Sequence, residues 1–223
     1  MSVDVAEGRP PAQTEPWDSP KRRQIMDGAR EVFLTLGFDA ARMEEIARKA
    51  GVSKATLYVY FDSKEALFTD VVMCNVAATI ARFGSHAPEG RTIEQRLENV
   101  GVTVLRWVLV SDTVGLMRAA IAGANRFPDL ANSVHQMARK RGAEAVAQLL
   151  AEVAGSGELG TLPAFAPECL AMTARFFLDL VLLPLMMRAL FGEQLKLLHA
   201  EIELHVAKSV AYFLALCRHG GLT

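Results

Sequence analysis

Apolar residues recur at helical spacing along almost the whole chain, and no segment shows the strict alternation of a half-buried strand. Ser19-Pro20 begins the first helical segment, because serine is a favoured cap and proline fits the first helical position. Pro184 is expected to interrupt or kink a long apolar helix near the C-terminus. The pattern predicts an all-α protein with about nine helices, at residues 20–37, 43–50, 54–60, 63–83, 93–110, 113–126, 129–153, 167–191 and 193–218.

One stretch, residues 42–64 (RMEEIARKAGVSKATLYVYFDSK), reads as two short helices joined by a tight turn. Gly51 follows the first helix and supplies the residue most easily placed in a left-handed conformation, which ends that helix. Ser53 can accept a hydrogen bond from a free backbone N–H and cap the second helix. Leu57 and Phe61, four residues apart, are expected to face inward and anchor it.

A short helix with two buried anchors presents its other side chains outward, and here these include Lys54, Ala55, Thr56 and Tyr58. The arrangement predicts a helix-turn-helix whose second helix enters the major groove of DNA. Lys54 and Thr56 are expected to contact bases or phosphates, while Ala55 lets the helix lie close and can touch a thymine methyl group. Lys64 stands among the free N–H groups of the next helix start and is expected to anchor a phosphate.

Overall charge does not favour DNA binding, since the net charge is -1 and the pI is about 6.5. The charge is unevenly distributed, however. Residues 19–64 contain nine Lys or Arg against six Asp or Glu, so the helix-turn-helix segment is locally basic. The cations at 21–23 open the first helix, where they are either solvated or placed to touch phosphate or the minor groove.

Residues 1–18 carry three prolines among small and polar residues and are predicted to form a flexible tail without a secretory signal. The three cysteines are odd in number and far apart, so a reducing cytoplasm is the expected location. The longest apolar run, residues 176–187, is too short to span a bilayer, and no membrane association is expected.

The segment GFDAARMEEIARKAGVSKATLYVYFDSKEALF, residues 37–68, resembles the DNA-binding domain of TetR-family transcriptional regulators. The resemblance covers residues 19–70, and small, apolar and aromatic positions agree in register. The piece LMRAAIAGANRFPDLA, residues 116–131, looks like the corresponding stretch of the AcrR/AefR-like branch. At Ala41 and Arg42 the family usually has Thr or Ser, whose hydroxyl caps the next helix. Here Asp39 is expected to cap in part, or the helix start frays, and Arg42 is free to bind phosphate or a guanine edge.

The resemblance implies a helix-turn-helix domain at 19–79 and a helical regulatory and dimerisation domain at 80–223. It also implies a homodimer formed through the last two helices, a double-stranded DNA operator as partner, and a small hydrophobic effector. In the family pattern, the residues matching Tyr58 and Tyr60 lie near phosphates. The candidate DNA-binding residues are Arg42, Ser53, Lys54, Ala55, Thr56, Tyr58, Tyr60 and Lys64.

Polar and apolar side chains of the second domain are candidates for an effector pocket. Arg175 and Asp179 lie four residues apart in an apolar helix, where they form either an ion pair or a polar handle in a pocket or dimer interface. Residues of each apolar type are more often plain core than pocket lining. The candidate ligand-binding residues are Trp107, Met117, Arg175, Phe176, Asp179 and Met187.

The five histidines show no metal-ligand spacing, and the chain has no phosphate loop, nucleophile elbow or HExxH helix. We therefore expect no catalytic residues, no cofactor, no metal site and no enzyme activity. The sequence favours a dimeric repressor that a small apolar ligand releases from a palindromic operator, with the helix at 63–83 as the lever. The alternative is a DNA-binding dimer whose second domain serves only dimerisation or a protein partner.

Overall fold

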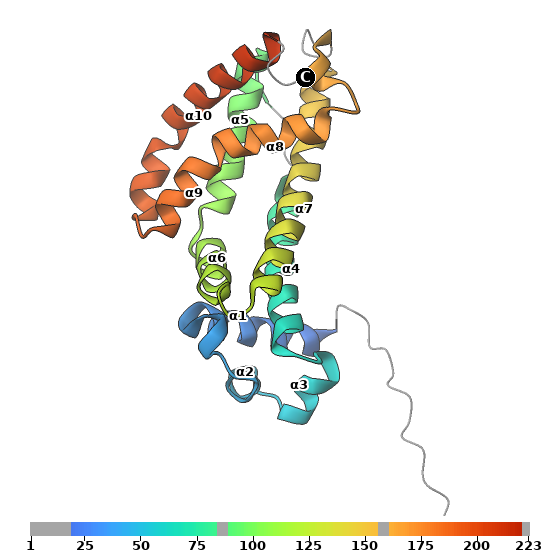
Figure 1. Ribbon diagram of the computed structural model, residues 1–223, viewed down its shortest axis with the longest axis vertical. Helices are drawn as coiled ribbons and strands as arrows, with labels where there is room; N and C mark the ends of the chain where they lie inside the picture. The colour runs from blue at the N-terminus through green and yellow to red at the C-terminus, as the bar shows by residue number, and fades with distance from the viewer. Residues whose placement is uncertain (1–18, 84–88, 156–160, 220–223) are drawn as a thin grey trace, which may run out of the picture.

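The computed structural model describes residues 19–83, 89–155 and 161–219, and throughout those ranges the chain is helical, without a strand (Figure 1). The predicted tail at 1–18 lies outside the described residues. The all-α prediction is confirmed. The α-helices are α1 (Pro20–Ala40), α2 (Met43–Lys49), α3 (Lys54–Tyr60), α4 (Lys64–Phe83), α5 (Ile93–Val108), α6 (Ser111–Gly123), α7 (Pro128–Ala154), α8 (Leu170–Val181), α9 (Leu183–Leu190) and α10 (Leu195–Arg218), with a 3-10 turn, η2, at Pro163–Phe165.

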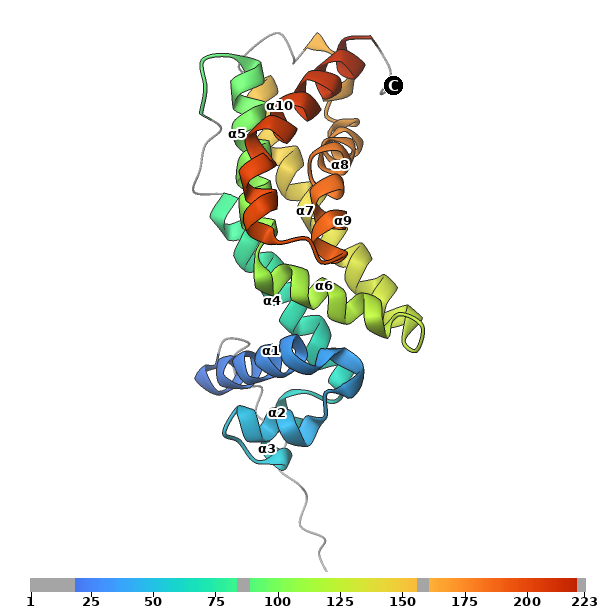
Figure 2. The same ribbon diagram turned by 90° about the vertical axis from the view of Figure 1, so that its left-hand side faces the viewer.

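The molecule is elongated, with α1, α2 and α3 at one end and α8, α9 and α10 at the other (Figure 1). Helix α4 leaves the first end and runs alongside α7 toward the second. Helix α1 lies across the lower side of α6, so the two ends also meet through these two helices (Figure 2). The arrangement sets a small α1–α3 head below a larger helical body.

Aromatic side chains form the centre of the head. Phe33 of α1 and Phe68 of α4 are fully buried with their ring centroids 5.0 Å apart, and Phe38 lies 5.0 Å from Phe68. The same core takes in Leu116 of α6 and Val134 of α7. The head therefore does not pack by itself, because part of its core comes from helices of the body.

The body has its own apolar core, built from α5, α7, α8 and α10. Phe177 of α8 and Phe213 of α10 are fully buried and pack edge to face at 5.2 Å between ring centroids. Ile80, near the end of α4, packs against this core, whereas the start of α4 belongs to the core of the head. Helix α4 therefore contributes to both cores.

The predicted helix at 167–191 is two helices in the structure, which raises the number of α-helices in the described ranges to ten. Helices α8 and α9 meet at Leu182 with a bend of 48°. Pro184 has no N–H to donate to Leu180, and Ser209 of α10 donates to that carbonyl instead at 3.3 Å. His205 Nε2 lies 2.8 Å from the carbonyl oxygen of Val181. Helix α10 therefore supplies partners at the break.

The first helix begins as predicted, since Ser19 caps it by accepting a hydrogen bond from the backbone N–H of Arg22 at 3.2 Å. The chain then turns at Gly37, whose φ of 76° lies in the left-handed region that glycine tolerates best. One more turn of helix follows and inserts Phe38 into the head core. Within the described ranges, no single helix is long and apolar enough to cross a membrane.

Candidate nucleic-acid interface

The turn between α2 and α3 has the geometry that the sequence predicted. Gly51 has a φ of 62°, and the backbone N–H of Ala50 donates to the carbonyl of Ile46 at 2.8 Å to close the first helix. Ser53 caps α3 by accepting a hydrogen bond from the backbone N–H of Thr56 at 3.0 Å. Both helix ends are therefore satisfied locally, and the angle between α2 and α3 follows from residues within the turn.

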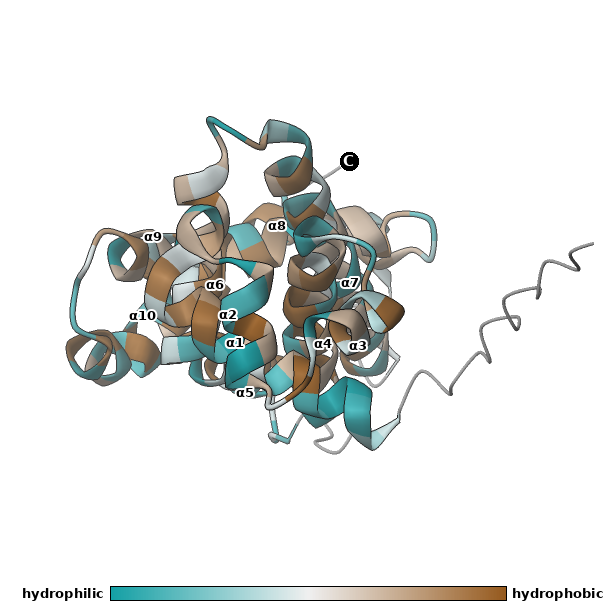
Figure 3. Ribbon diagram, turned by 90° about the horizontal axis from the view of Figure 1, so that it is seen from below, coloured by the Kyte–Doolittle hydropathy of each residue, from teal (hydrophilic) through white to brown (hydrophobic). Residues whose placement is uncertain are grey.

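Helix α3 has one buried side and one exposed side. Leu57 and Phe61 are buried in the head core as predicted, with Leu57 fully inaccessible. Lys54, Ala55 and Tyr58 are exposed on the other side. Val59, which was not among the predicted contact residues, is also exposed, at 76%. Figure 3 views the molecule from the end that carries this surface. The outer side of α3 is thus exposed and able to enter a groove.

The polar groups of that face are held by contacts within the head. Lys54 Nζ donates to the Glu44 carboxylate of α2 and lies 5.9 Å above the ring centroid of Tyr58. The hydroxyls of Ser53 and Thr56 share a hydrogen bond of 2.7 Å. The polar side chains of this face are therefore held in place by contacts within the head.

Arg42 occupies the cap position of α2 and makes no capping hydrogen bond with its side chain, as the sequence predicted. It is exposed, and none of the described residues accepts a hydrogen bond or ion pair from it. Asp39 does not cap α2, because its carboxylate accepts a hydrogen bond from Arg126 Nη1 at 2.8 Å. The carboxylates of Glu44 and Glu45, in the first turn, instead interact favourably with the positive end of the α2 dipole.

Lys64, predicted to anchor a phosphate, has its ammonium group bound within the head. Its ammonium group donates to the backbone carbonyls of Phe38, Asp39 and Ala41, at 2.8, 3.2 and 3.0 Å. It also lies 4.5 Å from the centre of the Phe38 ring, and burial lowers its pKa. All three N–H groups are thus used inside the head, where Lys64 joins the end of α1 to the start of α2. The sequence did not reveal this, because the three acceptors are main-chain atoms 23 to 26 positions away.

The cations at 21–23 are not all free to meet DNA. Arg22 forms an ion pair with Asp70 of α4 at 2.6 Å, and its guanidinium lies 5.1 Å from the ring centre of Phe61. Lys21 is exposed and donates to Gln24 at 3.0 Å. Arg22 therefore joins α1 to α4.

Tyr60, a predicted DNA contact, is half-buried beside the head core.

The predicted pairing of Arg175 with Asp179 is wrong. Asp179 accepts a hydrogen bond from Arg139 Nη2 of α7 at 2.8 Å, while Arg175 is exposed. Side chains four positions apart on a helix lie near each other. Here, however, Asp179 pairs with Arg139 of the neighbouring helix α7 and not with Arg175. Asp179 thus joins α7 to α8.

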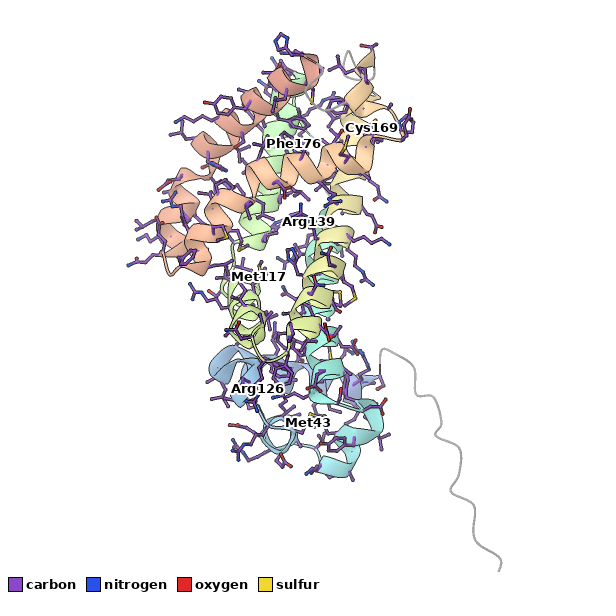
Figure 4. The ribbon with its side chains drawn as sticks, in the orientation of Figure 1. Met43, Met117, Arg126, Arg139, Cys169 and Phe176 are labelled. Carbon is purple, nitrogen blue, oxygen red and sulfur yellow. The ribbon has the colours of Figure 1, made fainter. Side chains whose placement is uncertain are left out.

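The remaining ligand-binding candidates separate into two groups. Trp107, Met117 and Phe176 are half-buried and pack against the body core, and Figure 4 shows Met117, Phe176 and Arg139 on helices that surround that core. Met187 lies on the outside of α9, 42% exposed. It is therefore not placed to line an internal pocket.

The described residues form a recess between the head and the body, but it is too small to hold a water molecule. Its walls include Phe38, Phe68 and Phe127, so aromatic rings fill the junction. Among the described residues, His, Cys, Asp and Glu also form no group suited to a metal ion.

Helices α8 to α10, at the end of the body away from the head (Figure 1), carry a set of exposed large apolar side chains. Phe191 is the most exposed, at 85%, and Leu204 is 63% exposed. Large exposed apolar surfaces of this kind mark interaction sites. We call this set the apolar flank; its members are Met172, Leu183, Met187, Phe191, Leu197, Leu204, Tyr212 and Leu216.

Two protein families match the chain. The family described as bacterial regulatory proteins, tetR family, matches residues 25–71, which contain α2 and α3. The C-terminal domain of AefR-like transcriptional repressors matches residues 95–218, more than half of the chain. Together the two matches cover both the head and the body.

Curated relatives resemble the head. The HTH-type transcriptional regulator UidR of Escherichia coli K12 is 39% identical over 64 residues, which are 29% of this chain and 33% of UidR. The HTH-type transcriptional regulator RutR of the same strain is 46% identical over 54 residues, 24% of this chain and 26% of RutR. The chain thus matches about a third of the length of UidR and about a quarter of RutR.

Solved structures match over nearly the whole chain. A structure assigned to the TetR family of transcriptional regulators, from Mesorhizobium loti MAFF303099, has a TM-score of 0.73 and 27% identity over 91% of this chain and 98% of its own. The flavonoid-responsive regulator FrrA has a TM-score of 0.66 and 28% identity over 88% and 96% of the two chains. GusR of Salmonella enterica, at 19% identity and a TM-score of 0.62 over 92% and 100%, shares the fold.

Proposed function

Because this chain belongs to the TetR family of DNA-binding transcriptional regulators, we propose that it is a dimeric repressor that a small apolar ligand releases from a palindromic operator. The relatives named above are transcriptional regulators rather than enzymes. The observation that carries the proposal is the two-sided helix α3, with Leu57 and Phe61 in the core and Lys54, Ala55 and Tyr58 outside. Such a helix can enter the major groove without disturbing the head.

We assign the DNA contacts of the head from the exposure of each side chain and from its hydrogen-bond partners. Ala55 and Thr56 read the groove, Lys54 contacts a phosphate beside it, and Ser53 positions Thr56 through its cap and hydroxyl bond. Tyr58, and Tyr60 at the C-terminal end of α3, donate to phosphates. Arg42, which is exposed and occupies the cap position of α2, binds a phosphate there. Lys64 is a positioning residue, since its ammonium is used within the head.

The apolar flank is the proposed dimer surface. Leu183 and Met187 of α9 and Phe191, directly after its end, follow one another at intervals of four residues. Leu197 and Leu204 are seven residues apart on α10. Both spacings keep side chains on one face of a helix, so the flank can pack against its own copy about a two-fold axis. A dimer of this kind presents two α3 helices to half-sites one DNA turn apart, roughly 34–36 Å.

The proposed effector is a flat aromatic compound. FrrA, 28% identical over 88% of this chain, is a flavonoid-responsive regulator by name. The half-buried Trp107, Met117 and Phe176 offer apolar contacts, and the partly exposed Arg139–Asp179 pair between α7 and α8 offers groups for ligand hydroxyls. A ligand there would lie against α5, α7 and α8, whose apolar side chains form the body core. Couplings of this kind are typically ~1–3 kcal/mol.

The closed junction between the head and the body favours a second candidate function. A DNA-binding dimer that responds to no small molecule needs no cavity, and its body would serve dimerisation or a protein partner. Both candidates share the head and the apolar flank, so they differ only in the effect of ligands.

The experiment that separates them uses the full chain and a duplex selected from a random library. Fluorescence anisotropy of the labelled duplex is followed while flavonoid aglycones are added at fixed salt. Release by an aglycone, lost in Phe176→Ala but kept in the exposed control Arg175→Ala, supports the ligand-responsive repressor. DNA binding that no aglycone weakens favours the second candidate, and failure to bind any selected duplex contradicts both.

A further inference from the structure

The N-terminal end of α3 lies beside charges of alternating sign. Glu44, in the first turn of α2, accepts a hydrogen bond from Lys54 of α3 and interacts electrostatically with Arg42. The hydrogen bond lowers the pKa of Glu44 and raises the pKa of Lys54, so the pair is fully charged at neutral pH. Both side chains are more than half exposed. A carboxylate therefore stands within the surface assigned to DNA.

This carboxylate changes the energetics of every DNA complex. A phosphate that takes Lys54 must break the ion pair, which costs little at an exposed site. It then leaves Glu44 unpaired against a duplex that carries one negative charge about every 1.7 Å along its axis. The repulsion is relieved only where the DNA offers a hydrogen-bond donor to the carboxylate. In the major groove, the cytosine N4 amino group is the donor with which Glu and Asp typically pair.

We propose that Glu44 is a specificity-determining residue that selects operators with a cytosine amino group beside the start of α3. On such DNA, Lys54 moves to a phosphate and Glu44 moves to cytosine, so both charges keep a partner. On other DNA the ion pair either stays closed, and a phosphate contact is lost, or opens and leaves Glu44 facing the backbone. Glu44 therefore weakens binding to non-operator DNA more than binding to the operator. This inference rests on the DNA-binding role proposed for α3.

The test compares the wild-type chain with Glu44→Gln and Glu31→Gln. Glutamine keeps the size of Glu44 and removes its charge. Glu31 is the matched control, because it is similarly exposed and pairs with Lys49 at 2.5 Å across α1 and α2. Each protein selects from a random duplex library, and anisotropy then gives its affinity for the selected operator and for a scrambled duplex at several salt concentrations.

We expect Glu44→Gln to lower the ratio of operator to scrambled affinity about tenfold and to lose the preference for cytosine at one symmetric pair of positions. On scrambled DNA, its salt dependence steepens by about 0.9 in the log–log slope, because Lys54 is released to one more phosphate. Glu31→Gln is expected to keep both the ratio and the selected sequence of the wild type.

An unchanged ratio and an unchanged cytosine preference in Glu44→Gln would overturn the inference. Equal tightening on both duplexes would also overturn it, since Glu44 would then act only as a general repulsive charge. If the wild-type chain enriched no sequence at all, the proposed function would fail and this inference with it.

Discussion

Arg126, in the turn between α6 and α7, donates a hydrogen bond to Asp39 of the head at 2.8 Å. Asp39 precedes α2, whose start has no side-chain cap. The ion pair of Arg126 (labelled in Figure 4) thus connects the body to the segment that precedes α2. The rings of Phe127 and Phe38, each next to one partner in sequence, pack edge to face at 5.0 Å. From the sequence, α4 is predicted to couple the two domains. The contact between Arg126 and Asp39 joins the body to the head at a second place.

Replacing Arg126 with alanine is expected to loosen the start of α2 with little loss of global stability. The pair is exposed, so the free energy of unfolding should fall by less than ~1 kcal/mol. Amide hydrogen exchange at Glu44–Ile46 should accelerate, and operator affinity should fall by roughly twofold to fivefold. Lys140→Ala, which removes an exposed contact to Glu144 within α7, is the control. Exchange that is the same in both variants would deny Arg126 this role.

Lys64→Met is expected to destabilise the head without removing a phosphate contact. Its ammonium donates to three backbone carbonyls. Because hydrogen bonds of a charged group are lost, the free energy of unfolding, measured in urea, should fall by about 1.5–3 kcal/mol. Because these contacts lie within the head, the salt dependence of DNA binding should keep its slope. Lys54→Met, by contrast, should leave folding intact and lower the slope by about 0.9. A slope that falls equally in Lys64→Met would restore the phosphate-anchor interpretation.

A charge in the middle of the apolar flank should separate the proposed dimer. Leu204→Glu would place a carboxylate in a buried self-contact, where an unpaired charge costs several kcal/mol. Sedimentation velocity should show the dimer becoming a monomer, and operator affinity should fall because the two half-sites are no longer linked. Ile121→Glu, which changes a similarly exposed residue on α6, should leave the dimer intact. A dimeric Leu204→Glu chain that binds DNA normally would exclude this surface.

The buried thiol of Cys217 should react far more slowly than the exposed thiol of Cys74. Burial raises the pKa of Cys217 from 9.0 to about 11, so at pH 8 its thiolate is roughly a hundredfold scarcer than that of an ordinary cysteine. Mass spectrometry after brief treatment with iodoacetamide should find Cys74 modified and Cys217 intact. The stability that the protonated thiol contributes is present below pH 9.0 and declines as the pH rises toward 11, because the unfolded thiol ionises first. Equal labelling of both cysteines would show that α10 opens readily.

Features that depend on neighbouring residues could be predicted from the sequence. The Ser53 cap, the left-handed Gly51 and the buried Leu57 each follow from residues within a few positions, where helix geometry determines which side chains meet. The same reasoning gave the all-α fold and the family.

Features that depend on contacts across the fold could not be predicted in this way. Lys64 binds carbonyls at least 23 positions away, and Asp179 binds Arg139, 40 positions away, instead of its helix neighbour. The break at Leu182 was foreseen as a kink at Pro184, but the separation into two helices also depends on partners from α10. Each of these requires the packed arrangement of helices, which local pattern does not contain.

Selection of bound duplexes from a random library, followed by footprinting of the best sequence, tests the central claim most directly. A two-fold dimer with α3 in the major groove predicts a palindromic consensus with half-sites about 10 base pairs apart, centre to centre, or a multiple of a DNA turn. It also predicts protection of both half-sites by one dimer. Enrichment of an asymmetric sequence, or of none, would contradict the account.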